Sequence, residues 1–279
     1  MVSTIQILPA LLLQPYISCY ALRTFDTGEA SILKPMHAVH EYYMTFFLRE
    51  RFCGFIDNSG VWQSNKSNSL CTLFTQNQGF TSYQGKYAIF CVQFKSNGLF
   101  AILGNRQKEL INSILALDEI IGSDNSLLTE QLESTKNIIE MGKLMDAYFL
   151  GRYLCKKHKE YTNVIACTSD VILQNRGMIS LALLSRFANM SQRNFERRFL
   201  DEVGVAPKLY ARITRFNKAL DNKMLHPEKR WTDIAYENGY FDQAHFIKEV
   251  HLFSSKSPEE LFRNSPPPIE DYKYEVEQD

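Results

Sequence analysis

The sequence predicts an α+β protein in which a strand-rich N-terminal half precedes an all-helical C-terminal region. Aromatic and β-branched residues broken by turn signals dominate residues 8–103, a pattern typical of short strands. Helical periodicity begins near residue 126, and two helix pairs of the same construction follow it. The 279 residues suffice for two domains of ordinary size. We therefore divide the chain into residues 1–160, residues 161–264 and a short tail, residues 265–279.

Two runs in the N-terminal half are the clearest strand candidates. Residues 42–48 and 87–94 are rich in tyrosine, phenylalanine and other residues that favour strands. Clusters of Asp, Asn, Ser and Gly at residues 57–60 and 96–98 mark turns. Several short strands at this spacing predict a small β-barrel or sandwich.

Residues 126–157 have the period of amphipathic helices, and we expect one shorter and one longer helix there. One stripe of side chains recurs at three- and four-residue steps: Ile138, Met141, Met145, Tyr148, Phe149 and Arg152. The stripe can pack on the predicted barrel, or it can pair with a second copy of the chain. Both interpretations stay open. Residues 165–173 are then expected to form the first helix of the C-terminal region.

Charge is unevenly distributed, although the net charge is zero. Residues 176–264 contain 15 Lys and Arg against 11 Asp and Glu, whereas the Pro-rich tail 265–279 contains one against five. The basic surplus favours a nucleic-acid partner for the helical region. We expect the acidic tail to be mobile.

No pattern points to export, membrane insertion or a disulfide framework. The six cysteines form no Cys-x-x-Cys pair, so we expect free, mostly buried thiols in a reducing compartment. The N-terminus lacks the features of a signal peptide, and no apolar run reaches the length of a membrane span. We therefore expect a cytoplasmic protein without a membrane partner.

The first helix pair begins at residue 180. Ser180 is placed to cap a first helix, Asn189 to occupy a tight turn, and Ser191 to cap a second helix. Phe195 and Phe199 lie one above the other on that second helix and mark its inward face. A short helix, a tight turn and a second helix follow the helix-turn-helix plan.

The opposite face of that second helix is charged. Arg193 and Arg197 are one turn apart, so they could address neighbouring base edges or phosphates of DNA. A connecting helix then runs from Pro207 to about residue 224, which is ~27 Å at 1.5 Å per residue. One turn of DNA is ~34 Å long. A rigid helix of this length can therefore hold two reading helices in successive major grooves.

The second helix pair repeats the plan between residues 232 and 250. Gly239 is placed at the turn, Asp242 at the cap, and Phe246 on the inward face. The outward face carries one certain cation among mainly apolar residues: Ala244, Ile247, Lys248 and His251. Aliphatic side chains can contact thymine methyl groups. A helix that mainly grips the DNA backbone is the alternative, and it stays open.

Residues 175–263 resemble the DNA-binding domain of the AraC/XylS family of bacterial transcription regulators. The matching pieces are 195–199 (FERRF), 203–207 (VGVAP), 234–235 (IA), 238–240 (NGY), 242–246 (DQAHF) and 257–258 (SP). The resemblance implies two helix-turn-helix subdomains joined by a helix, and a regulator that binds adjacent major grooves. It also implies an activator more often than a repressor.

The resemblance assigns DNA-contacting residues position by position. In the first unit they are Ser191, Gln192, Arg193, Glu196 and Arg197. In the second unit they are Asp242, Gln243, Ala244, His245, Ile247 and Lys248. The implied partners are double-stranded DNA, a small-molecule effector, RNA polymerase and a second copy of the chain in a homodimer.

Five residues depart from the family pattern: Ser185, Asn189, Lys248, Val250 and Ser255. Lysine at position 248 stands where arginine is common. Because lysine lacks the forked geometry of arginine, sequence recognition by the second unit should be weaker. The first unit is therefore expected to read sequence, and the second to anchor.

The N-terminal region resembles the sensor regions of one branch of the same family. The similar features lie at residues 8–20 and 92–100, followed by helices. This resemblance implies a cupin-like β-barrel with trailing helices, which senses an effector or mediates dimerisation and carries no catalysis. It implies no cofactor, and the effector site stays unknown.

The sequence allows three other interpretations. His37, His40 and Glu41 cluster beside a predicted strand, but their spacing does not match a metal cupin or a zinc protease, so no metal site is expected. The barrel could be a cupin-type enzyme fused to a DNA-binding module, although no Gly-rich phosphate loop or nucleophile motif supports catalysis. A protein-interaction adaptor is the third reading.

Overall fold

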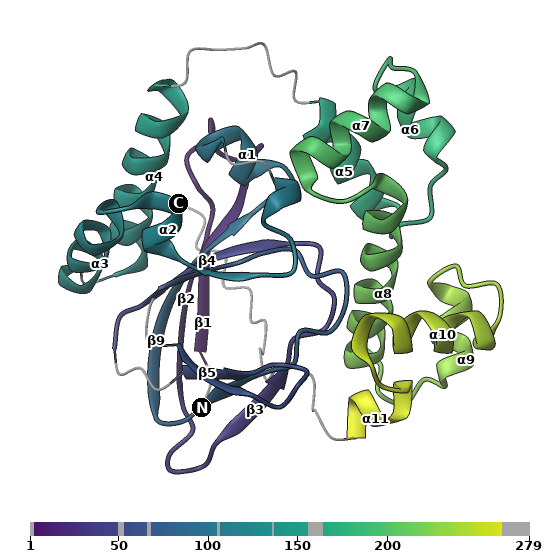
Figure 1. Ribbon diagram of the computed structural model, residues 1–279, viewed down its shortest axis with the longest axis horizontal. Helices are drawn as coiled ribbons and strands as arrows, with labels where there is room; N and C mark the ends of the chain where they lie inside the picture. Colours follow the sequence, from purple (N-terminus) through teal and green to yellow (C-terminus); the bar gives the residue numbers. More distant parts are fainter. Residues whose placement is uncertain are drawn as a thin grey trace.

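A computed structural model describes residues 3–49, 53–65, 68–104, 107–135, 137–155 and 164–263. It confirms the α+β class: two antiparallel sheets with associated helices precede a region built only of helices (Figure 1). We call residues 3–155 the β-domain and residues 164–263 the helical region. The predicted domain boundary at residue 160 and the tail at 265–279 lie outside the described residues.

The β-domain contains a six-stranded and a four-stranded sheet. The first has the order β1 (Ser3–Ile7), β2 (Ile17–Asp26), β9 (Lys86–Phe94), β4 (Tyr42–Phe47), β7 (Ser69–Cys71) and β10 (Ile114–Ala116). The second has the order β3 (Ile32–Pro35), β8 (Phe80–Tyr83), β5 (Cys53–Ile56) and β6 (Trp62–Asn65). Both strands predicted from the sequence are present, with ends shifted by one residue.

Alternation along the strands gives the six-stranded sheet two distinct faces. Tyr42, Met44 and Phe46 of β4 are all fully buried and belong to the large core, because every second side chain of a strand points to the same side. The opposite face carries a smaller cluster that includes Cys91 and is joined by Tyr83 from the four-stranded sheet. The two sheets thus meet across the second face.

Helices cover the large-core face of this sheet. They are α1 (Gly98–Leu103), the short 3₁₀ helix η1 (Gln107–Glu109), α2 (Leu117–Ile121), α3 (Asp124–Ser134) and α4 (Ile138–Cys155). Gly142 lets α4 approach the sheet closely, since a Cβ there would lie 2.4 Å from the Ile7 Cδ1 atom. The short and long helices predicted between 126 and 157 are therefore α3 and α4.

The stripe on α4 is covered within the chain itself. Ile138, Met141, Met145 and Phe149 are buried in the large core. Tyr148 and Arg152 hydrogen-bond Asp124 of α3. The barrel-packing interpretation of the stripe is therefore correct, and the stripe is not a free surface for a second copy.

The helical region contains seven helices within its described range. They are α5 (Val164–Gln174), α6 (Leu181–Phe187), α7 (Gln192–Val203), α8 (Pro207–Leu225), α9 (Trp231–Glu237), α10 (Gln243–Ser254) and α11 (Pro258–Arg263). Figure 1 shows α8 running between the α5–α7 group and the α9–α11 group. Among the helices described, none is both long and apolar enough to cross a membrane.

Five cysteines are free thiols: Cys19, Cys71, Cys91, Cys155 and Cys167. Cys19 and Cys91 are buried, and burial raises the pKa of Cys19 to about 12. Cys155 and Cys167 are exposed. The expectation of mostly buried thiols is therefore correct for Cys19 and Cys91, whereas Cys71 is half-buried and the two helical cysteines are exposed.

Candidate DNA-binding surface and its contact with the β-domain

Side-chain caps fix the N-termini of both helices in the first unit. The Ser180 hydroxyl accepts a hydrogen bond from the Leu183 amide at 3.2 Å, and the Ser191 hydroxyl accepts one from the Asn194 amide at 3.3 Å. Each satisfies an amide that the first helical turn leaves without a partner. Asn189 takes the turn with a φ of 52°, a left-handed conformation that asparagine tolerates. The first unit is thus built as its sequence predicts.

Helix α7 (Gln192–Val203) has one buried and one exposed side. Phe195, Phe199 and Val203 are fully buried, whereas Arg193 and Arg197 are exposed to solvent. The guanidinium of Arg197 donates to the Asn194 side-chain oxygen at 2.9 Å. This contact restrains the arginine before any ligand arrives.

A second arginine of α7, Arg198, forms an ion pair within the protein. Arg198 Nε lies 2.6 Å from Glu202 Oε1, and Glu202 is only 3% exposed. A buried carboxylate needs a charged or hydrogen-bonding partner. Of the two adjacent arginines, Arg197 is therefore available to a ligand and Arg198 holds Glu202.

The second unit repeats the side-chain cap on its second helix only, since α9 begins without one, and its turn is longer. Gly239 has a φ of 72°, and the Asp242 carboxylate accepts from the His245 amide at 2.7 Å to cap α10 (Gln243–Ser254). Phe246 and Val250 are fully buried. The exposed positions of α10 include Gln243, Ala244, Ile247 and Lys248, while Asp242 and His245 are half-buried.

Glu249 joins α10 to the connecting helix α8. It is 4% exposed, and its carboxylate lies 2.5 Å from Arg212 Nε and 3.5 Å from Arg215 Nη2. Arg215 also lies over the Tyr240 ring, 4.8 Å from its centroid. The sequence reasoning missed this ion-pair cluster, because an acidic residue among the polar and apolar positions of α10 gives no indication of its partner on another helix.

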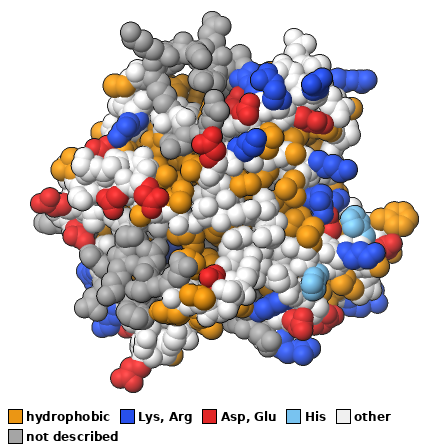
Figure 2. Space-filling view, in the orientation of Figure 1, with side chains coloured by type: hydrophobic (Ala, Val, Ile, Leu, Met, Phe, Trp, Pro, Cys, Tyr) orange, Lys and Arg blue, Asp and Glu red, His pale blue; other side chains and the backbone are white. Residues whose placement is uncertain are grey.

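The connecting helix α8 has 19 residues, which is ~28 Å at 1.5 Å per residue. It begins at Pro207, whose missing amide suits a first helical position. Helix α8 connects the unit that contains α7 with the unit that contains α10 (Figure 1). Lys and Arg side chains gather along the side of the molecule where this region lies (Figure 2).

The β-domain contacts both units. Tyr42 donates from its hydroxyl to the Val203 carbonyl oxygen at the end of α7, at 3.0 Å. The Ala38 amide donates to the Phe253 carbonyl oxygen of α10 at 2.9 Å. Asn97 donates to the buried Glu202 carboxylate at 3.2 Å. One short segment, residues 37–42, therefore contacts both the first and the second unit.

Gly204 permits the close approach at the end of α7. Its φ is 87°, and a Cβ there would lie 2.8 Å from Ile111 Cγ2 and 3.0 Å from both the Gln107 carbonyl and the Tyr42 hydroxyl. A left-handed residue after a helix is usually glycine. Here glycine also makes room for the β-domain.

The two histidines considered for a metal site serve this contact. The His37 ring lies 5.6 Å from the Phe216 ring of α8, edge to face, and burial lowers the pKa of His37 to about 4. His40 Nδ1 lies 2.7 Å from the Asn217 side-chain oxygen. Among the described residues, no cluster of three or more His, Cys, Asp or Glu side chains has the arrangement of a metal site.

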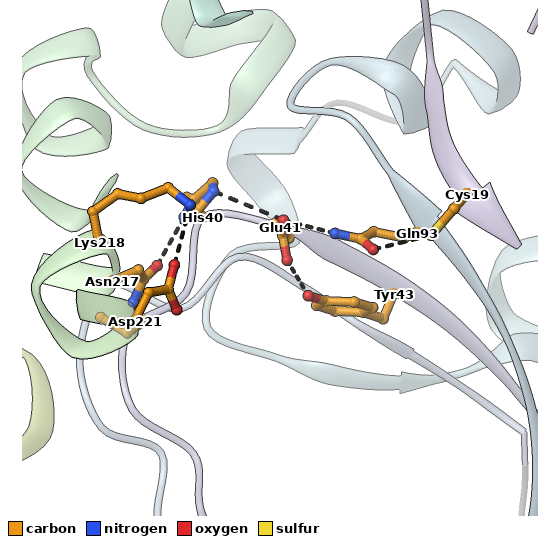
Figure 3. A network of polar contacts seen from close by, with 9 residues as sticks. Cys19, His40, Glu41, Tyr43, Gln93, Asn217, Lys218 and Asp221 are labelled. Atoms are coloured by element: carbon orange, nitrogen blue, oxygen red, sulfur yellow. Dashed lines mark hydrogen bonds and ion pairs between the residues drawn. The ribbon is translucent and has the colours of Figure 1, made fainter. Parts of the chain in front are cut away.

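A chain of polar contacts connects the sheet to α8 (Figure 3). Gln93 of β9 donates to Glu41 at 2.7 Å and accepts from the Cys19 thiol at 3.3 Å. Glu41 also accepts from Tyr43, and it lies 3.8 Å from His40 Nε2. Since His40 contacts Asn217, this chain passes from β2 to the connecting helix.

Residues 184–264 match the family model described as a helix-turn-helix domain. This region is an AraC-type helix-turn-helix domain. The chain is accordingly a DNA-binding transcription regulator. No sequence among the curated proteins matches it.

Three solved structures are similar to most of this chain at low identity. ToxT from Vibrio cholerae, in a P21 crystal form, is 11% identical with a TM-score of 0.48, and the match covers 89% of this chain and 99% of that chain. Wild-type ToxT from Vibrio cholerae strain SCE256, with an unsaturated fatty acid bound, is 14% identical with a TM-score of 0.45, covering 87% and 95%. The AraC-like transcriptional activator CuxR is 12% identical with a TM-score of 0.30, covering 72% and 76%.

The predicted DNA-contacting residues all lie in the AraC-type domain, around the first turns of α7 and α10. The structure brings them into two groups on two separate helices, one group to each unit. Ser191 and Asp242 hold the helix caps. The remaining residues are exposed except for Glu196 and His245, which are half-buried. Whether they contact DNA stays a prediction.

Proposed function

We propose that this regulator reads two successive major-groove segments of duplex DNA with α7 and α10, which we call the reading helices. The observation that carries the proposal is their shared construction. Each has a side-chain cap, a buried aromatic face and an exposed opposite face, and both are attached to α8. The first turns of a recognition helix are the part that reaches base edges in helix-turn-helix proteins.

The proposed readers of the first unit are Gln192, Arg193, Glu196 and Arg197, and those of the second are Gln243, Ala244, Ile247 and Lys248. Ser191, Asp242 and His245 are proposed to contact the phosphate backbone nearby. Gln192 donates to Glu196 at 3.1 Å, so these two side chains present a joined polar surface. The first unit should supply most of the sequence preference.

The β-domain is proposed to set the orientation of the two units in response to a small-molecule effector or to homodimer formation. Support comes from segment 37–42, which touches α7, α8 and α10. A change at Glu41 or Gln93 would pass to α8 through His40. Sedimentation of the full chain over a concentration series, with and without DNA, tests for the homodimer.

The decisive experiment is selection of bound fragments from random duplex DNA by the full chain. Binding to the selected site is then measured by fluorescence anisotropy. Replacing Arg197 with alanine should weaken it roughly 5- to 150-fold, because a good arginine–base contact is worth about 1–3 kcal/mol. Lys143→Ala, an exposed change on α4, is the matched control. Unchanged affinity in Arg197→Ala would exclude this residue as a reader.

Salt dependence distinguishes DNA binding from the adaptor reading. Affinity should fall steeply as salt rises, because bound phosphates release counterions. Transcription from the selected site with purified RNA polymerase then gives the direction of regulation, which we propose to be activation. If no sequence is enriched in the selection, the proposed function is wrong.

A further inference from the structure

One aromatic side chain of the second unit is exposed to solvent instead of packing in the core. Phe241 is 85% exposed and directly precedes Asp242, the cap of α10. An apolar residue at this position commonly packs against the fourth residue of the helix. In α10 that residue is Phe246, which is fully buried and contacts the rings of Trp231 and Tyr240. Phe241 is therefore left outside the core.

The turn of the second unit explains this position. In the first unit, the left-handed residue Asn189 precedes the cap Ser191 by two positions. In the second unit, the left-handed Gly239 precedes the cap Asp242 by three positions. Tyr240, 3% exposed, turns inward. The additional residue of the longer turn is placed at the entry to α10 and faces solvent.

Phe241 extends an apolar row on α10. Ala244 and Ile247 follow it at three-residue steps, and residues three apart share a helix side. Ala244 is exposed, and Ile247 is 38% exposed. Aligned on the caps, the first unit has Arg193 and Glu196 at the positions of Ala244 and Ile247. The two reading helices thus present different chemistry to their ligand.

We propose that α10 recognises thymine methyl groups in the major groove and that Phe241 is the specificity-determining residue at its entry. This inference rests on the proposed function, in which α10 enters the groove. The apolar row is continuous with the polar readers Gln243 and Lys248 on the same exposed side of α10. Thymine is the base that offers an apolar group in the major groove, through its C5 methyl.

The apolar character of this row favours contact with bases over contact with the phosphate backbone. A phenyl ring gives no hydrogen bond to phosphate and gains only where water is displaced from another apolar surface. Burial of one methyl group contributes about 0.8 kcal/mol, which corresponds to roughly fourfold in affinity. Several thymines in the half-site of α10 should therefore give a measurable preference.

Deoxyuridine substitution tests the inference directly, because uracil differs from thymine only by the missing methyl. Base positions at which Arg197→Ala loses its sequence preference are assigned to the half-site of α7. The remaining positions of the selected site are assigned to α10. Thymines in the other half-site are then replaced by deoxyuridine. Wild-type affinity should fall about fourfold for each contacted methyl. Phe241→Ala should bind the normal site more weakly and lose the response at the thymine nearest the entry to α10, while thymines that contact Ala244 and Ile247 keep theirs.

Phe187→Ala is the matched control, since it removes an exposed phenyl ring (60% exposed) from α6 of the first unit. It should keep the full deoxyuridine response, and Phe241→Leu should keep part of it. An equal response of wild type and Phe241→Ala at every thymine of this half-site overturns the inference while DNA binding by the protein stands. Unchanged DNA affinity together with lost transcription in Phe241→Ala also overturns it, and indicates a protein contact at Phe241.

Discussion

Removal of one hydroxyl group tests whether the β-domain holds the first unit. In Tyr42→Phe, the Val203 carbonyl oxygen loses the hydrogen bond that it accepts at 3.0 Å. Tyr42 is fully buried, so no bulk water replaces the lost donor. An unpaired buried polar group costs about 1–3 kcal/mol. If the cost falls on the contact between domains, the undocked population rises roughly 5- to 150-fold.

Hydrogen exchange followed by mass spectrometry measures this population. Amides near the end of α7 and the start of α8 should exchange faster in Tyr42→Phe, because undocking exposes them. Tyr20→Phe is the control. It removes an equally buried hydroxyl that donates to Asp146 at 2.9 Å within the β-domain. It should lower the melting temperature without a local change in the helical region.

Identical exchange at the end of α7 in the two variants would refute the reasoning. The hydrogen bond would then contribute to general stability and not to docking. A lower melting temperature does not distinguish docking from general stability, because the melting temperature of both variants should fall by about 2–4 °C per kcal/mol of lost stability.

Three further predictions concern buried or half-buried charges. Arg198→Ala should lower stability by about 3 kcal/mol, because the buried Glu202 carboxylate loses its charged partner and keeps only the hydrogen bond from Asn97. It should leave base preference intact, since no proposed reader changes; urea unfolding and selection from random DNA check the two parts. Glu249→Gln should loosen α10 from Arg212 and so weaken the second half-site more than the first, as footprinting of each half-site would show. Because burial lowers the pKa of His37 to about 4 from 6.5, its neutral form is favoured by folding. The free energy of unfolding should therefore fall by at most about 3 kcal/mol between pH 6.5 and 4, and parallel pH curves for wild type and His37→Leu would contradict this.

Local sequence rules predicted the AraC-type domain well, because its elements are set by local physical chemistry. Ser180 and Ser191 cap helices through their own hydroxyl groups, and Asn189 and Gly239 occupy turns that demand a left-handed backbone. These effects act within four residues of the chain. Phe195 follows from helical periodicity alone, and it is fully buried as expected.

The contacts between distant segments could not be predicted in this way. His40 and Asn217 are 177 positions apart, and Asn97 and Glu202 are 105 apart. Nothing in either local pattern names the other partner. The histidines were considered only as metal ligands, and the structure places them against α8. Phe241 gave no signal at all, because its importance appears only once its exposure is known.

The use of one segment to contact both units has a consequence for domain exchange between regulators. Residues 37–42 are complementary to α7 through Val203, to α8 through Asn217 and to α10 through Phe253. A chimaera that joins this β-domain to the helix-turn-helix region of another protein would lack these complementary positions, even if every residue proposed to contact DNA were retained. A functional chimaera would therefore have to retain the helix positions that contact the β-domain as well as the side proposed to face DNA.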